Sequence, residues 1–227
     1  MTSRTMLTIL FMVAALQSHA QLDDEYRWEA GAGLGFTGYL GDFNGNISKN
    51  QQPSATLLLR RVFNPSMTLK LAGTLGKLKG NAKDVKTVYP ELSEKRYAFS
   101  KSLIDLGVAY EYNLWPYGTG HDYRGAKPFT PYVMAGLGTT YVSGNGQHTF
   151  TANIPLGAGL KYKLNERLNI GLEWAMHFSL SDQLDGVKDP YGIESKGAFK
   201  NTDSYTTLQL TLTYSFAPKC TNCNKDF

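Results

Sequence analysis

The chain has 227 residues, of which 42% are hydrophobic, 12% aromatic and 19% charged, and its formal net charge is +4. This aromatic content with so small a net charge excludes a disordered chain, and the mean hydropathy of -0.30 excludes a bundle of membrane-spanning helices. No lysine- or arginine-rich run occurs, so we expect no nucleic-acid partner. The length suits one β-barrel or sandwich better than two α/β domains.

The first twenty residues have the pattern of a signal peptide. Arg4 precedes an apolar run over residues 6–16, and the small-residue sequence Ser18-His19-Ala20 follows it. The apolar run is too short to span a bilayer as a helix. We therefore expect residues 1–20 to be removed after Ala20 and the mature chain to leave the cytoplasm.

Beyond the signal, long segments alternate between large apolar side chains and small or polar ones. A period of two is typical of strands whose two faces meet different surroundings. The clearest case is residues 168–180, where Leu168, Ile170 and Leu172 alternate with Asn169 and Gly171. Eight segments have this pattern, at about 26–41, 55–63, 67–76, 101–112, 129–141, 154–163, 168–180 and 205–216.

The connections between these segments form two classes that alternate along the chain. We expect long, polar connections near 42–53, 79–98, 143–152 and 181–203, and shorter ones at 64–66, 113–127 and 164–167. An even number of strands with short turns on the side of both termini is typical of outer-membrane barrels. The pattern predicts an all-β fold, an eight-stranded antiparallel transmembrane β-barrel of outer-membrane type over residues 21–216, with a periplasmic C-terminal tail over residues 217–227. Both mature termini are then expected in the periplasm.

The composition of the two faces favours this barrel over a soluble, lipocalin-like one. A soluble barrel would hold its large apolar side chains inside, whereas here glycines and charged residues share one face, which suits the narrow interior of an eight-stranded barrel. Charges of both signs on that face can pair with one another. The expected interior charge network consists of Arg27, Glu29, Arg60, Lys70, Asp105, Glu111, Lys161 and Glu173.

Aromatic residues of the apolar face gather at the strand ends nearest the short turns. Outer-membrane barrels carry such girdles where the wall meets the membrane interface, so outer-membrane lipid is an expected partner. The residues expected in this girdle are Tyr26, Trp28, Phe63, Tyr110, Tyr112, Phe129, Tyr162, Tyr214 and Phe216.

One pair of residues could carry catalysis. His177 and Ser179 lie two apart on one strand face, as a base and a nucleophile could, and they resemble the pair of outer-membrane lipid A deacylases. Their parity points them into the barrel, away from lipid, so we interpret His177 as a hydrogen-bonded interior residue. We expect no catalytic residues, no metal site and no cofactor.

Cys220 and Cys223 lie in the predicted tail. A structural zinc site normally needs four ligands, and the tail supplies two. In the oxidising periplasm the pair could form a disulfide within the tail or a disulfide to a partner protein, and both alternatives stay open.

Several segments resemble one known family, the PorG-type outer-membrane barrels of the Bacteroidetes type IX secretion system. The resemblance covers most of the mature chain and implies a non-enzymatic outer-membrane component that associates with the periplasmic ring of the lipoprotein PorK and PorN. It also implies a role in protein export and, in some species, in gliding motility. The segments that carry it are residues 38–42 (GYLGD), 130–133 (TPYV), 135–138 (AGLG), 156–163 (LGAGLKYK) and 167–174 (RLNIGLEW).

Two other functions stay open from the sequence. A generic small outer-membrane barrel that serves adhesion or envelope stability would need no periplasmic partner. An outer-membrane lipid-modifying enzyme would need His177 and Ser179 to face the lipid.

Overall fold

Eight antiparallel strands follow one another around a closed barrel in the computed structural model. The structure describes residues 26–40, 50–81, 98–118, 127–144, 147–165, 167–180, 184 and 203–218, so the predicted signal peptide and both cysteines lie outside the described residues. The strands are β1 (Tyr26–Leu40), β2 (Gln52–Asn64), β3 (Met67–Asn81), β4 (Ala98–Asn113), β5 (Phe129–Gly144), β6 (Gln147–Lys163), β7 (Leu168–Ser179) and β8 (Ser204–Pro218).

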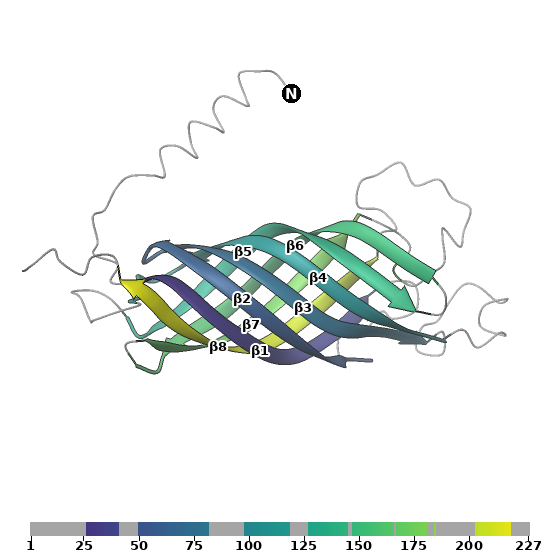
Figure 1. Cartoon of the computed structure of the whole chain (residues 1–227), viewed down its shortest axis with the longest axis horizontal. Coiled ribbons are helices and arrows are strands. Elements are labelled where there is room, and N and C mark those ends of the chain that lie inside the picture. Colours follow the sequence, from purple (N-terminus) through teal and green to yellow (C-terminus); the bar gives the residue numbers. More distant parts are fainter. Residues whose placement is uncertain are drawn as a thin grey trace, which may run out of the picture.

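The barrel closes where the first strand meets the last. β1 pairs with β2 on one side and with β8 on the other, for example through Trp28 opposite Phe216 and Leu34 opposite Leu210. Figure 1 shows β8, in yellow, beside β1, in purple, with all strands inclined to the long axis of the barrel. Closure leaves no free sheet edge, as a barrel in lipid requires. No helix in the described part of the chain is long and apolar enough to cross a membrane.

The predicted alternation is confirmed along the strands. In β4 the inward residues Leu103, Asp105 and Glu111 are buried, whereas the outward residues Ile104 and Leu106 are exposed. Large apolar residues on the outer wall are highly exposed, with Leu34 at 73% and Leu57 at 71%. So much exposed apolar surface would be energetically unfavourable in water. The wall is therefore built to meet an apolar surrounding.

One predicted connection is wrong. Residues 143–152 were expected to form a long loop, but β5 continues to Gly144 and β6 begins at Gln147. Only Asn145 and Gly146 separate the two strands, and Asn-Gly is a strongly favoured pair for a two-residue hairpin connection. Threonines in this stretch extend the pairing, as Thr140 opposite Thr151 shows. The β5–β6 hairpin therefore reaches further along the barrel than the sequence pattern indicated.

The two ends of the barrel differ in their connections. At the short-turn end, β2 joins β3 through residues 65–66, β4 joins β5 through residues 114–128, and β6 joins β7 through residues 164–167. At the opposite end, here called the long-loop end, the connections are 41–51, 82–97, 145–146 and 180–203. β8 ends at Pro218, at the short-turn end, two residues beyond the predicted end of the barrel.

Candidate functional site in the barrel lumen

Six of the eight predicted interior charges meet in one group near the short-turn half of the lumen. This charge network consists of Glu29, Arg60, Lys70, Glu111, Lys161 and Glu173. All six side chains are buried. They come from β1, β2, β3, β4, β6 and β7, so the network ties together strands from all around the barrel.

Glu111 lies at the centre of the network. Its carboxylate accepts a hydrogen bond from Arg60 Nε at 3.1 Å and another from Lys161 Nζ at 2.6 Å, and Lys70 Nζ lies 3.6 Å away. Glu111 is fully buried. A carboxylate without water is costly unless cations and donors replace its hydration, and three cations do so here.

Glu173 and Glu29 complete the balance of charge. Lys70 Nζ donates to Glu173 Oε2 at 2.5 Å, and Arg60 Nη1 lies 3.6 Å from Glu29 Oε2. The network thus holds three cations and three carboxylates, a net charge of zero. Neutral, interlocked ion pairs are what a water-poor lumen can accommodate.

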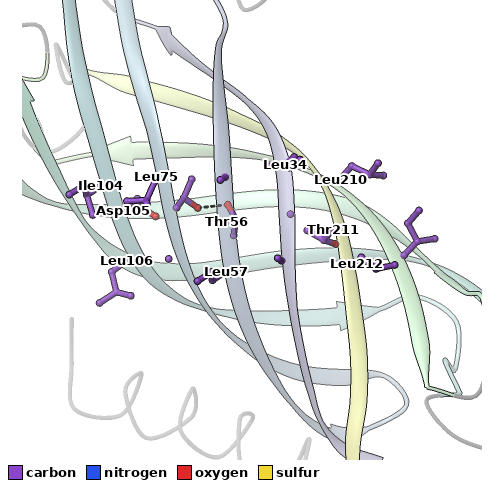
Figure 2. A pocket seen from close by; sticks show the side chains of 16 residues that line it. Leu34, Thr56, Leu57, Leu75, Ile104, Asp105, Leu106, Leu210, Thr211 and Leu212 are labelled. Carbon is purple, nitrogen blue, oxygen red and sulfur yellow. Dashed lines mark hydrogen bonds between the residues drawn. The ribbon is translucent and has the colours of Figure 1, made fainter.

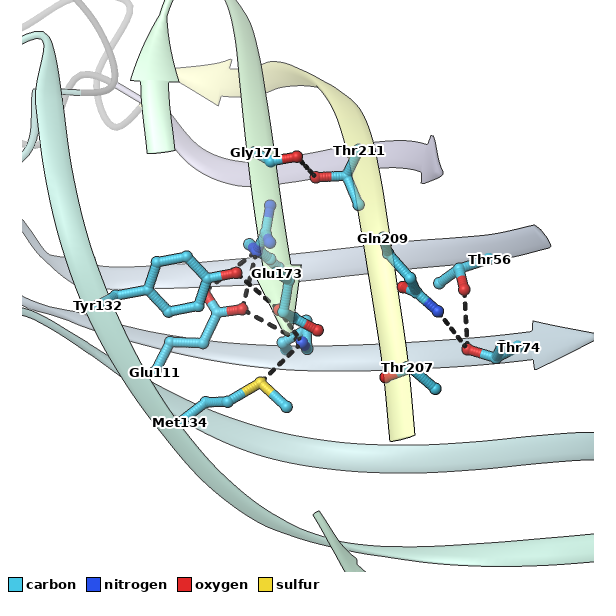
Figure 3. A network of polar contacts seen from close by, with 12 residues as sticks. Thr56, Thr74, Glu111, Tyr132, Met134, Gly171, Glu173, Thr207, Gln209 and Thr211 are labelled. Carbon is cyan, nitrogen blue, oxygen red and sulfur yellow. Dashed lines mark hydrogen bonds and ion pairs between the residues drawn. The ribbon is translucent and has the colours of Figure 1, made fainter. Parts of the chain in front are cut away.

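A tyrosine reaches across a glycine to join this network. Tyr132 on β5 donates its hydroxyl proton to Glu173 Oε2 on β7 at 2.6 Å, as Figure 3 shows. Gly159 on β6 lies between them, paired with both residues. A Cβ at Gly159 would lie 2.6 Å from two ring atoms of Tyr132, so only glycine leaves room for the ring.

The prediction for Arg27 is wrong, because this side chain is exposed at the beginning of β1. The β1–β8 ladder has no pair between Arg27 and Ala217, and Ala217 adopts a φ of 58°. Alternation is interrupted at this point. Tyr26 is correspondingly buried, although it was expected in the outer aromatic girdle.

Asp105, the remaining predicted charge, lies in a second polar cluster toward the long-loop end. Its carboxylate accepts hydrogen bonds from Asn153 Nδ2 at 2.6 Å, Tyr205 Oη at 2.7 Å and Thr140 Oγ1 at 3.2 Å. His177 stacks on the ring of Tyr205 with centroids 4.4 Å apart. Asp105 is thus satisfied mainly by neutral donors and does not join the charge network.

The predicted inward orientation of His177 and Ser179 is confirmed. Both side chains are buried, and the Nε2 of His177 lies 3.3 Å from Thr207 Oγ1, while its Nδ1 lies 4.0 Å from an Asp105 oxygen. Ser179 Oγ bonds instead to Thr151, 3.4 Å away. Neither residue faces the outer wall, where a lipid substrate would lie.

A small cavity of about 30 Å³ lies in the lumen between the charge network and the Asp105 cluster. A cavity of this size is large enough to hold a water molecule. Its lining includes Lys70 and Glu173 on one side and Asp105, His177 and Gln209 on the other.

The long-loop end of the lumen is filled by an apolar plug. Its buried members are Tyr39, Leu78, Phe99, Leu103, Val142, Leu184 and Tyr205. The rings of Tyr39 and Phe99 meet edge to face with centroids 5.1 Å apart. Leu184, from the connection between β7 and β8, is held there by its N–H, which donates to Asp203 Oδ2 at 2.9 Å.

Tyr117 closes the short-turn end. It belongs to the connection between β4 and β5, yet it is buried, and its hydroxyl donates to Asn169 Oδ1 at 2.9 Å. Asn169 in turn donates to Ser215 at 3.0 Å. Burial, followed by the nearby Glu29 charge, raises the pKa of Tyr117, so the phenol stays protonated and remains a donor.

The outer wall is apolar where it is hollowed. A shallow hollow of about 1070 Å³ extends over parts of β1–β4, β7 and β8, and Figure 2 shows leucines and Ile104 around it. Small residues, including Ala32, Ala55 and Gly73, form its floor between the larger side chains. The polar residues that line it, Thr56, Thr74, Asp105 and Thr211, have buried side chains, so the exposed surface of the hollow is mainly apolar and matches acyl chains.

The described residues contain no group of three or more His, Cys, Asp or Glu side chains arranged to hold a metal ion.

The sequence analysis did not identify the tyrosines that hydrogen-bond to the buried polar side chains of the lumen. Tyr132 and Tyr205 have the inward parity and could have been found from it, whereas Tyr117 could not, because its segment has no strand alternation.

A closed antiparallel barrel with a polar, ion-paired lumen and an apolar wall is a transmembrane β-barrel of the outer-membrane type. The chain belongs to the family described as "Domain of unknown function (DUF6089)", whose model matches residues 3–225. No curated protein gave a significant match.

Several solved structures are similar in outline. Neisserial surface protein A is 15% identical, with a TM-score of 0.48 over 83% of this chain and 97% of that one. The N-terminal β-barrel domain of OprF from Pseudomonas aeruginosa is 13% identical, with a TM-score of 0.47 over 84% and 98%. The outer-membrane enzyme PagL is 14% identical, with a TM-score of 0.42 over 82% and 97%.

Proposed function

We propose that this barrel is a non-enzymatic, non-conducting outer-membrane component of a protein secretion machine, the type IX system that the PorG-type sequence resemblance implies. In this role it anchors a periplasmic assembly, the ring of PorK and PorN. The observation that carries the proposal is the filling of the lumen by side chains from Tyr117 at one end to Leu184 at the other.

A filled lumen favours an anchor over a channel. The charge network crosses the barrel from β1 to β7, and the apolar plug closes the other end. Opening a path would break several buried ion pairs at once, at a cost of several kcal/mol for each charge left alone. Cargo must then cross the membrane elsewhere, with this protein holding other parts in place.

The position of His177 and Ser179 supports a non-enzymatic role. Both point into the lumen, and His177 is stacked on Tyr205. A lipid-modifying enzyme needs its base and nucleophile within reach of the lipid. The described outer wall offers no such pair.

Deletion of the gene tests the proposed function. We expect a defined set of exported proteins to accumulate in the periplasm of the deletion strain and their export to return with the wild-type copy. Crosslinking in intact envelopes should join the barrel to the PorK and PorN ring. Normal export in the deletion strain, with lower resistance to detergents or weaker adhesion, would support the generic envelope barrel instead.

The orientation forms part of the proposal, with the short-turn end and both mature termini in the periplasm. Single cysteines can be introduced into a background in which Cys220 and Cys223 are changed to serine. Ser66 lies in the β2–β3 turn, and Thr87 belongs to the β3–β4 connection. A membrane-impermeant thiol reagent on intact cells should label Thr87→Cys and leave Ser66→Cys unlabelled. The reverse pattern would contradict this orientation.

A further inference from the structure

The two faces of the barrel wall differ in charge: the inner face holds cations and carboxylates together, whereas the exposed charges of the described residues have one sign. Every carboxylate in the described residues lies inside, and none is more than 7% exposed: Glu29, Asp105, Glu111, Glu173 and Asp203. The exposed charges of the same part of the chain are all cations: Arg27, Arg61, Lys77, Lys79, Lys127 and Arg167. The described outer surface therefore presents only positive charge.

These exposed cations have no carboxylate partner among the described residues, because the ion pairs formed there all involve buried side chains. A surface that carries only cations beside an apolar wall is complementary to an anionic layer that borders an apolar one. Phospholipid headgroups above their acyl chains have that arrangement.

Four of the cations lie at the short-turn end, and three of these, Arg61, Lys127 and Arg167, lie against an aromatic ring. Arg61 lies 5.7 Å from the ring centroid of Trp28 and 5.5 Å from that of Phe63. Lys127 lies 4.7 Å from the ring of Trp115. Contacts of this kind hold a long cationic side chain in place at little cost to its charge.

The third of these cations is Arg167. It lies 5.3 Å from the ring of Tyr26, its Nε donates to the Tyr26 hydroxyl at 3.1 Å, and its Nη1 donates to the Tyr214 hydroxyl at 3.1 Å. Two of the five guanidinium N–H donors are used in this way, which leaves the others for an anion. Tyrosine thus orients the guanidinium without neutralising it.

The three cations are spread around the rim. Arg61 is on β2, Lys127 lies two residues before the beginning of β5, and Arg167 immediately precedes β7. Tryptophan and tyrosine in membrane proteins concentrate at the level of the headgroups. Trp28, Trp115 and Tyr214, which lie beside these cations, therefore place the charges at the depth of lipid phosphates.

We propose that Arg61, Lys127 and Arg167, with their aromatic neighbours, form three binding sites for the phosphate groups of anionic phospholipids at the short-turn rim. The sites would fix the depth of the barrel in the bilayer and enrich anionic lipid around that rim. This inference does not depend on the proposed role in secretion.

The test uses the full-length mature barrel in phosphatidylcholine bilayers with a trace of spin-labelled phosphatidylglycerol or spin-labelled phosphatidylcholine. Electron paramagnetic resonance then gives the relative association constant of the two lipids for the protein. We expect the wild type to prefer phosphatidylglycerol, and a variant with Arg61→Gln, Lys127→Gln and Arg167→Gln to lose most of that preference. The loss should be up to about fivefold for each removed charge.

Two control variants separate the rim sites from general positive charge. Arg61→Lys with Arg167→Lys keeps the charge and should retain most of the preference. Lys77→Gln with Lys79→Gln removes exposed cations from the long-loop end and should cost less for each charge. Heat-modifiable migration on gels checks that every variant is folded.

The proposal is overturned by a wild type that shows no preference, by a triple variant that keeps the wild-type preference, or by an equal loss for each charge in the Lys77 and Lys79 variant. A triple variant that keeps its lipid preference but loses a periplasmic protein partner would assign the cations to a protein surface, and this also overturns the proposal.

Discussion

Toward the short-turn end the lumen is filled by ion pairs and tyrosine hydroxyls, whereas toward the long-loop end it is filled mainly by aromatic and aliphatic side chains, with Lys101 and Asp203 also buried there. In the first region, Glu111 depends on Arg60, Lys70 and Lys161. In the second, Leu103 depends on the shape of its neighbours. Both regions are closed by buried side chains, but through different interactions.

The two regions should differ in how far the effect of a single substitution extends. Removal of one member of the charge network leaves buried charges without partners, so one substitution affects several strands. Removal of part of the apolar plug leaves a cavity into which the neighbours partly relax. The charge network should therefore be the less tolerant of the two.

Glu111→Ala is expected to have the largest effect. It leaves Arg60, Lys70 and Lys161 without their shared carboxylate and should destabilise the barrel by about 3–5 kcal/mol. Urea unfolding in lipid vesicles, followed by tryptophan fluorescence, measures this change. A loss below about 1 kcal/mol would mean that water already reaches the network.

Leu103→Ala tests the apolar plug with a smaller expected effect. Leu103 is almost completely buried, so its truncation should cost about 2–4 kcal/mol by loss of contacts and formation of a cavity. The volume-conserving Leu103→Met should cost less than about 1.5 kcal/mol in the same unfolding experiment. Equal losses for the two variants would show that packing does not hold this end closed.

Gly159→Ala tests the tyrosine that crosses β6. The new methyl group would meet the ring of Tyr132, and we expect a loss of about 1–3 kcal/mol. Combined with Tyr132→Ala, the same change should cost less, because the clash with the ring disappears, whereas the close contact of the new Cβ with the backbone oxygen of Leu172, also at 2.6 Å, remains; a double-mutant cycle measures that coupling. Additive losses in the cycle would contradict the proposed fit.

Tyr117→Phe should have the smallest effect of the series. It removes only the hydroxyl that donates to Asn169, which corresponds to about 0.5–1.5 kcal/mol. The phenylalanine ring still fills the short-turn end, so the folded fraction at low urea should not change. A larger loss would indicate that the hydrogen bond also positions the β4–β5 connection.

The sequence was sufficient to predict the strands and the faces of their residues, because the period of two is local. Glu29, Arg60 and Glu173 could be placed inside from parity alone. Their partners could not be predicted, because Lys70 and Glu173 are 103 residues apart and meet only through the closure and register of the barrel. Asp105 has the same parity and yet belongs to another cluster, since it lies further along the barrel axis.

The misplaced residues lie where local geometry overrides alternation. Arg27 becomes exposed at an interruption of the β1–β8 ladder, which depends on the conformation of Ala217 far away in the sequence. The connection near residues 143–152 was predicted to be long because its side chains are polar. The pair Asn145-Gly146 favours a two-residue hairpin connection and would have corrected this prediction.

Single-channel recording in planar bilayers tests most directly whether the lumen is closed. The wild-type barrel should show no steady ionic conductance, because the charge network and the apolar plug both block the lumen. A combined variant with Glu111→Ala and Leu103→Ala should give transient openings if it inserts. A steady, large conductance of the wild type would contradict the closed lumen and with it the proposal that the barrel is an anchor.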